Sequence, residues 1–292
     1  MELIAYFMQR GHFDPKDMSD DFSKDLHETF LEMLDGQKRY FLKKDIAQFD
    51  RFKYALDDEF RALQTNFFDL VYTRYLERRN ETKSFYLEIL ARPFDFNKKE
   101  EINVDYENQQ YPSNLRSKVE KWRKQLKLST LNILHGKLEE EEKLAAKDES
   151  YVPKIFAVLE KEAREITKEN MENYFSLMED VREEDWFGSY LNAFVTQFDP
   201  HSVYFAPVDK DRFDASMSGK YEGIGARLTK RNQAIKIVDV ISGGPIWRDQ
   251  SIEVGDQIMM VRQEEGVSVD VQSMRLDDAI KLIKGPAGTT VY

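Results

Sequence analysis

The sequence predicts a multidomain α+β protein, in which a mainly helical N-terminal region precedes a small β-sandwich or barrel domain with one helix packed on it. Before Pro207, apolar residues recur mostly at spacings of three and four, which is the period of an amphipathic helix. After Pro207, glycines recur every few residues and separate the short strand candidates AIKIVDVI and QIMMVRQ from one helix candidate, MRLDDAIKLIKG. This change of pattern predicts a domain boundary near Asp214.

Composition limits the classes of function. The 292 residues suffice for two domains and a sizeable core, and they carry a formal charge of −11 with a pI near 5.1. An acidic chain is a poor match for nucleic acid or for an anionic membrane surface, since both attract basic proteins. The absence of cysteine excludes disulfides and thiolate metal sites and leaves the redox compartment open.

The sequence leaves the cellular compartment open. No apolar run approaches the roughly 18 residues expected of a membrane span. The opening MELIAYFM is too short and too polar for a signal peptide and has no basic n-region. Either the protein is cytosolic or an export signal has been removed, and composition does not decide between these readings.

Residues 1–95 are predicted to form an N-terminal helical domain. In SDDFSKDLHETFLEMLDG, Ser19 supplies a capping oxygen at the start and Gly36 stands just past the end. The apolar stripe of this helix comprises Phe22, Leu26, Phe30, Met33 and Leu34. A second stripe comprises Ile46, Phe49, Phe52, Leu56, Phe60 and Leu63, and TNFFDLVYTRYLERR and ETKSFYLEILA continue the pattern to Pro93. Such stripes are typical of a helical core rather than of a cofactor site, so no cofactor is expected.

Residues 96–112 lose the helical period and are predicted to be an extended connector. The period returns over 113–213, a second helical segment that leads into the last domain. Its apolar anchors are Trp122, Leu126, Leu131 and Leu134, followed by a short helix through Trp186, Tyr190, Leu191, Phe194 and Val195. Glu139 with Lys143, and Glu160 with Arg164, have the spacing of ion pairs on exposed helices. The run from Glu139 to Glu142 is predicted to be a solvated face.

Motifs for catalysis and for metal binding are weak. DPHS, at 199–202, holds an acid, a histidine and a serine, but a relay needs the histidine between the other two, and chain neighbours tend to point apart. Asp199 before Pro200 fits the start of a turn, which is the favoured interpretation. The four histidines are scattered and include no pair at ligand spacing, so no metal site is expected. GIGARL and GPAGTT each lack defining parts of nucleotide-binding loops.

The remaining candidate site is the glycine loop in SGKYEGIGARLTKRN, residues 218–232. Gly223 and Gly225 can take positive φ and turn the N–H groups around Ile224 inward, as a nest for an anion. The next residues, including Ala226 and Leu228, suit a strand whose free edge would accept a peptide with its terminal carboxylate in the nest. The second wall would be the helix at 275–284, whose apolar face comprises Leu276, Ala279, Ile280 and Ile283. An ordinary hairpin turn is the alternative.

At these residues the chain resembles a known family. YEGIGARL, VISGGPIWRD, IEVGDQIMMV and LDDAIKLIKGPAGTTV look like the PDZ domain of carboxy-terminal processing proteases, also called tail-specific (Prc/Tsp-like) proteases. FDPHSVYFAP resembles the segment that leads into that domain. The stretch from Gly11 to Asp50, together with PFDF and NVDYEN, is similar to the helical N-terminal region of the family's long branch. The resemblance covers most of 10–292 and implies a PDZ-like domain over 214–292, with a groove helix and a last strand cut short at Tyr292.

The resemblance also implies a function. It points to a serine endopeptidase, periplasmic or otherwise exported, that recognises the apolar C-terminal tails of protein substrates and cleaves with a serine–lysine dyad. The dyad belongs to a domain that follows the PDZ, so no catalytic residue is assigned within 1–292, and this segment is expected to be inactive alone. The family's peptide-binding loop maps onto Tyr221, Glu222, Gly223, Ile224, Gly225 and Ala226, with Tyr221 replacing a more usual phenylalanine or leucine, and its groove helix maps onto Leu276–Ile283.

The implied partners are substrate tails and a protease domain in cis, without nucleic acid or membrane contact. Two other readings stay open: a helical–PDZ adaptor that binds peptides without proteolysis, and an enzyme complete within these residues.

Overall fold

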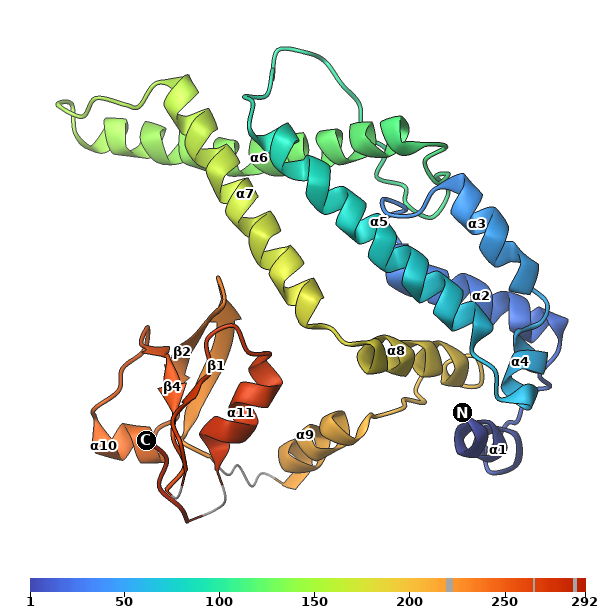
Figure 1. The fold of residues 1–292 in the computed structure, drawn as a ribbon. Helices are drawn as coiled ribbons and strands as arrows, with labels where there is room; N and C mark the ends of the chain where they lie inside the picture. Colours follow the sequence, from blue (N-terminus) through green and yellow to red (C-terminus); the bar gives the residue numbers. More distant parts are fainter. Residues whose placement is uncertain (219–222, 265, 286–287) are drawn as a thin grey trace. The chain divides into compact units, whose positions relative to one another are not determined.

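The computed structural model describes residues 1–218, 223–264, 266–285 and 288–292 (Figure 1). The chain divides into two compact units, which we call the helical unit and the sheet unit. The helical unit comprises Met1–Met171 and Val181–Tyr204, and the sheet unit comprises Glu172–Asp180 and Phe205–Tyr292. The predicted α+β class, with helices first and a small antiparallel sheet domain after them, is confirmed.

The helical unit is built from helices of unequal length. They are α1 (Glu2–Arg10), α2 (Asp20–Asp35), α3 (Lys43–Phe49), the 3₁₀ helix η1 (Asp50–Phe52), α4 (Leu56–Ala62), α5 (Asn66–Leu90), α6 (Leu115–Lys147), most of α7 (Phe156–Asp180) and α8 (Glu183–Val195). The Ser19 side chain accepts a hydrogen bond from the Phe22 amide at the start of α2, as the sequence predicts. Residues 96–112 contain no helix or strand, as expected of a connector.

Aromatic rings fill the core between α2, α4, α5 and α8. Tyr190 of α8 is fully buried, and its ring centroid lies 4.9 Å from that of Phe30 on α2. Phe60 of α4 stacks on Phe194 of α8 with centroids 4.0 Å apart. These side chains occupy the predicted stripes, so the stripes form a helical core.

The stripe over residues 43–63 departs from the expected regularity, because the chain breaks it into α3, η1 and α4. Ala55 leaves the helical conformation before α4, and Leu63 ends α4 with a left-handed φ of 56° and half of its surface exposed. Met33 on α2 is also 49% exposed. A stripe read from spacing alone assumes one straight helix, and the chain over 43–63 turns at Ala55 and at Leu63. Met33 lies within the unbroken α2, so these turns do not account for its exposure.

The expectation that Glu160 and Arg164 form an exposed pair is wrong. Their side chains are 5% and 10% exposed, respectively. The Arg164 guanidinium donates to the carbonyl of Leu90, which is the last residue of α5, and Glu160 accepts from the Phe94 amide. The pair is buried because it satisfies backbone groups where α5 ends.

The predicted solvated face at 139–142 is interrupted by Glu141. Its carboxylate accepts hydrogen bonds from the Tyr151 hydroxyl and the Lys154 amide, each at 2.8 Å, and the residue is buried. Glu139 and Lys143 remain exposed, as expected, with 3.9 Å between their charged atoms.

The sheet unit holds short strands and further helices. The elements are α9 (Pro207–Ser218), β1 (Ala226–Arg231), β2 (Ala234–Val240), α10 (Pro245–Asp249), β3 (Gln257–Ile258), β4 (Met260–Val261), β5 (Val269–Asp270) and α11 (Leu276–Lys284). One antiparallel sheet has the order β1-β2-β3, and β4 pairs with β5. The core comprises Ile235, Val261, Val271, Ala279 and Ile283. Because β1 has a sheet neighbour only on the β2 side in the described part of the unit, its other edge faces the groove described below.

The end of α7 belongs to the sheet unit. Lys230 of β1 is 8% exposed, and its ammonium contacts the Asp180 carboxylate at 2.5 Å and the Ser273 carbonyl at 3.3 Å. Asn173 accepts a hydrogen bond from the Asn232 amide in the β1–β2 turn.

Over the residues the structure describes, no helix is long and apolar enough to cross a bilayer.

Candidate peptide-binding groove

The glycine loop adopts the backbone that its sequence predicts. Gly223 and Gly225 have φ of 140° and 79°, respectively. The carbonyls of Ile224 and Gly225 accept hydrogen bonds from the amides of Ile246 and Ile241, at 3.1 and 2.9 Å. Within the described residues, the amides of Gly223, Ile224 and Gly225 donate to no backbone carbonyl. The loop is therefore held through its carbonyls, and its donors remain available.

Gly225 and Gly244 permit a close approach of two backbone segments. A Cβ atom on Gly225 would lie 2.9 Å from the Gly244 Cα and 3.0 Å from the Pro245 Cδ. A Cβ atom on Gly244 would lie 3.0 Å from the Gly225 Cα. Only glycine fits at both positions, which gives a physical reason for Gly225 in the loop and for Gly244 directly before α10.

A groove of about 250 Å³ runs between the loop, β1 and α11. Its lining includes the predicted residues Gly223, Ile224, Gly225, Ala226, Leu228, Ile280 and Ile283. Two further predicted residues lie away from this lining in the described structure: Ala279 is fully buried in the domain core, and Leu276 packs against that core. Tyr221 and Glu222 lie outside the described residues.

Four groove residues were missed from sequence: Ile241, Gly244, Pro245 and Lys284. Lys284 lies in the last turn of α11, and its Cγ is 3.5 Å from where a Cβ on Gly223 would stand. The C-terminal end of a helix carries a partial negative charge, which would repel an anion held at the glycine loop. A lysine there offsets this repulsion. A basic residue at the end of the expected groove helix was therefore the sequence signal that could have identified Lys284 as a groove residue.

The arrangement can hold the end of a peptide. Ile224, Leu228, Ile280 and Ile283 provide an apolar floor, and the loop amides with the Lys284 ammonium provide donors at one end. The open edge of β1 offers backbone groups in the geometry that an added strand needs. These features match a chain terminus that carries a carboxylate beside an apolar side chain.

The DPHS segment forms the predicted turn. The His201 amide donates to the Asp199 carboxylate, and the Ser202 amide donates to the Asp199 main-chain carbonyl. The ring nitrogen Nδ1 of His201 lies 3.1 Å from the Asp199 carboxylate. The Ser202 hydroxyl also faces Asp199, at 3.5 Å. His201 and Ser202 therefore both contact Asp199, whereas a catalytic relay needs the histidine between the serine and the acid.

The sheet unit has a glycine loop, an open strand edge and a groove helix, which together define a PDZ-type module. It follows a helical domain in the sequence. A family model described as "PDZ domain" matches residues 214–292. A second, described as "Tail specific protease N-terminal domain", matches residues 4–208. Since the second match covers most of the chain, the chain belongs to the tail-specific protease family through its N-terminal domain, which confirms the resemblance drawn from the sequence.

Individual relatives agree with the family. The "Tail-specific protease" of Haemophilus influenzae is 28% identical over 290 residues, which cover 97% of this chain and 38% of the relative. The "Carboxy-terminal processing protease CtpA" of Bacillus subtilis is 34% identical over 93 residues, which cover 32% of this chain and 19% of the relative. The chain therefore spans well under half the length of these relatives.

One solved structure is also similar, the PDZ domain of the carboxy-terminal protease from Vibrio cholerae in complex with peptide. It is 43% identical, with a TM-score of 0.24, and the match covers 24% of this chain and 71% of that one.

Proposed function

We propose that the chain is the N-terminal and PDZ portion of a tail-specific serine endopeptidase. Its groove binds the C-terminal residues of protein substrates and delivers them to a downstream protease domain that carries a serine–lysine dyad. The observation that carries this proposal is the groove itself, where the Gly223–Gly225 loop closes one end of an apolar cleft with amides that donate to no backbone carbonyl among the described residues. Membership of the tail-specific protease family supports the proteolytic reading over a peptide-binding adaptor.

Recognition follows from three contacts. The terminal carboxylate accepts hydrogen bonds from the loop amides, and the last side chain fills the cleft beside Ile280 and Ile283. The peptide backbone adds to the edge of β1. Each contact is modest, so the expected affinity is micromolar, on the order of −7 to −8 kcal/mol. By the same family resemblance, we propose that the protein acts outside the cytoplasm.

The proposal is tested by calorimetric titration of the 292-residue chain with an apolar-ended peptide and with its C-terminally amidated twin. Amidation removes the charge that the loop is proposed to bind, so we expect the free acid to bind at least tenfold more tightly. Equal affinities would contradict recognition of the terminal carboxylate by the loop amides.

A pair of variants locates the binding. Ile280→Ser, in the groove, is expected to weaken the free acid about tenfold, because a buried apolar contact of ~1.4 kcal/mol is lost. Ile252→Ser is the matched control, since Ile252 is 36% exposed, as against 37% for Ile280, and is not among the groove-lining residues. A similar loss in both variants would place the peptide elsewhere.

A further inference from the structure

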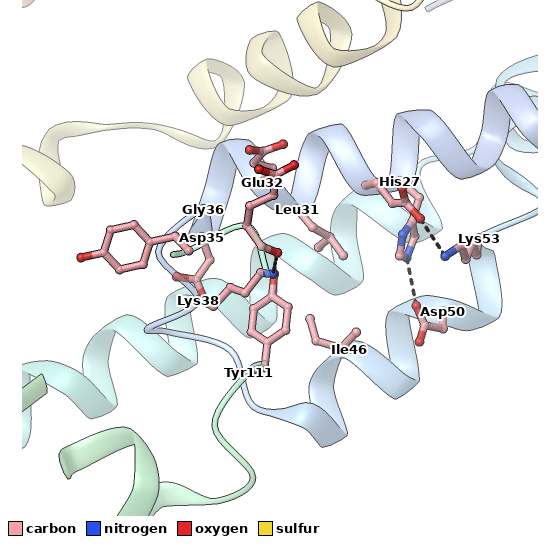
Figure 2. Close-up of a pocket in the computed structure, with 13 residues that line it drawn as sticks. His27, Leu31, Glu32, Asp35, Gly36, Lys38, Ile46, Asp50, Lys53 and Tyr111 are labelled. Atoms are coloured by element: carbon pink, nitrogen blue, oxygen red, sulfur yellow. Dashed lines mark hydrogen bonds and ion pairs between the residues drawn. The ribbon is translucent and has the colours of Figure 1, made fainter. Parts of the chain in front are cut away.

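A second cleft, of about 450 Å³, lies in the helical unit between α2 and α3–η1 (Figure 2). Its third side is the connector near Tyr106, Glu107 and Tyr111. Leu31, Ile46 and Tyr111 give it apolar walls, and charged side chains surround them. None of these residues lines the groove of the sheet unit.

His27 is the unexplained group in this cleft. It is 2% exposed, and within the described residues neither ring nitrogen has a partner at full hydrogen-bond geometry, although the Phe49 backbone lies near enough to favour the charged ring. Oδ1 of Asp50 lies 3.8 Å from Nε2, which is beyond hydrogen-bond distance (Figure 2). Buried polar atoms without partners are rare and costly in native proteins. A bound ligand would supply the hydrogen-bond partner that this imidazole lacks.

The imidazole is neutral at neutral pH. Burial lowers the pKa of His27, and this effect outweighs the opposing influence of Asp50 and of the Phe49 carbonyl. Lys53, which also faces the ring, lowers the pKa further, while Glu28 raises it. A neutral imidazole has one nitrogen that accepts a hydrogen bond.

The donors around the cleft are already engaged. The Lys38 ammonium donates to the carbonyls of Glu107 and Gln109, at 2.7 and 2.9 Å. The Lys53 ammonium pairs with Glu28 at 2.8 Å.

The acceptors are in excess. The lining holds five carboxylates and two lysines; the carboxylates belong to Glu28, Glu32, Asp35, Asp50 and Glu107. In the described part of the chain, those of Glu32 and Glu107 have no ion-pair partner. The cleft can therefore accept further hydrogen bonds from a positively charged donor.

We propose that this cleft binds a free linear polyamine, with one ammonium between His27 and Asp50 and its methylene chain along Leu31, Ile46 and Tyr111. The neutral imidazole accepts one N–H, and Asp50 supplies the countercharge. The methylene chain replaces water against the apolar wall. A lysine side chain of another polypeptide shares this alkylammonium chemistry and is distinguished by experiment.

The test is calorimetry of the 292-residue chain with putrescine, with 1,4-butanediol and with Nα-acetyl-lysine methylamide. Butanediol has the same carbon chain without charge, so we expect putrescine to bind and butanediol to bind at least a hundredfold more weakly. The lysine derivative should bind at least tenfold more weakly than putrescine. Absent putrescine binding, or equal binding of butanediol, overturns the site; tighter binding of the lysine derivative overturns the free polyamine as its ligand.

Variants separate the cleft from general attraction to an acidic protein. Asp50→Asn, at a side chain that is 51% exposed and so tolerant of change, should weaken putrescine at least tenfold. Asp58→Asn, which removes the same charge from a 77% exposed side chain outside the cleft lining, should change affinity less than twofold. Equal effects of the two substitutions would contradict the proposal.

Discussion

Lys284 shows how much a single side chain adds to a groove made mostly of backbone and apolar surface. The loop amides are neutral donors, whereas Lys284 brings a full charge to the same end of the groove. Within the described residues it has no ion-pair partner, so its ammonium is available to a ligand. We therefore expect it to strengthen the distinction between a free carboxylate and an amide.

Lys284→Gln should weaken binding of a free-acid peptide about fivefold, which is ~1 kcal/mol for a partly exposed ion pair, and should leave the amidated peptide unchanged. Lys281→Gln is the control, because Lys281 lies on the same helix outside the groove lining. Fluorescence anisotropy with labelled peptides at low and high salt measures both, and the effect should shrink in high salt. If Lys284→Gln weakens acid and amide alike, the residue acts on the groove's structure rather than on the carboxylate.

At the scale of elements, Asp45 joins α3 to α5. Its carboxylate is fully buried, caps α3 by accepting from the Leu42 amide, and accepts two hydrogen bonds from the Arg78 guanidinium at 2.7 and 2.9 Å. Arg74 adds a contact at 2.5 Å. Burial alone would raise the pKa of Asp45, but the hydrogen bonds from Arg78, Leu42 and Arg74 outweigh it and lower the pKa.

Asp45→Asn should lower the free energy of unfolding by about 3 kcal/mol at neutral pH, because the buried Arg78 guanidinium loses its fully buried countercharge and keeps only the partly exposed Glu81. Asp58→Asn also removes a carboxylate paired with an arginine, but from an exposed pair, and should cost less than about 1 kcal/mol. Urea denaturation measures both.

The pH dependence gives a second check on Asp45. A depressed pKa in the folded state stabilises the protein above the unfolded-state pKa of about 4, and this stabilisation is lost as pH falls through the lower folded-state pKa. The gap between wild type and Asp45→Asn should therefore be constant near neutrality and narrow below about pH 4. A gap independent of pH would show that the carboxylate charge is not its source.

The same helices show what periodicity can predict. Four of the five residues in the predicted stripe of α2 are buried and Ser19 caps the helix, whereas Met33 is exposed. The burial of Glu160 with Arg164 was not predicted, because it depends on backbone groups at the end of α5 that only the fold brings near. The sequence pattern of an i,i+4 ion pair is the same whether the pair lies on an exposed helix or is buried against the end of a neighbouring helix.

At the scale of the molecule, the groove was half predictable. Its glycine loop and helix were found from sequence because positive φ and an amphipathic face leave local signals. Ile241, Gly244 and Pro245 were missed because they reach the groove through the packing of Gly225 on Gly244, which no local pattern encodes. The cleft beside His27 left no sequence signal, since its residues come from α2, α3, η1 and the connector.

The central claim is that the Gly223–Gly225 amides bind the free carboxylate of another polypeptide. Amide chemical shifts of the ¹⁵N-labelled chain, recorded while an apolar-ended peptide is added, test it most directly. We expect the largest shifts at residues 223–228 and 280–284, and we expect them to disappear when the peptide is amidated. Shifts confined to other regions, or unchanged by amidation, would contradict it.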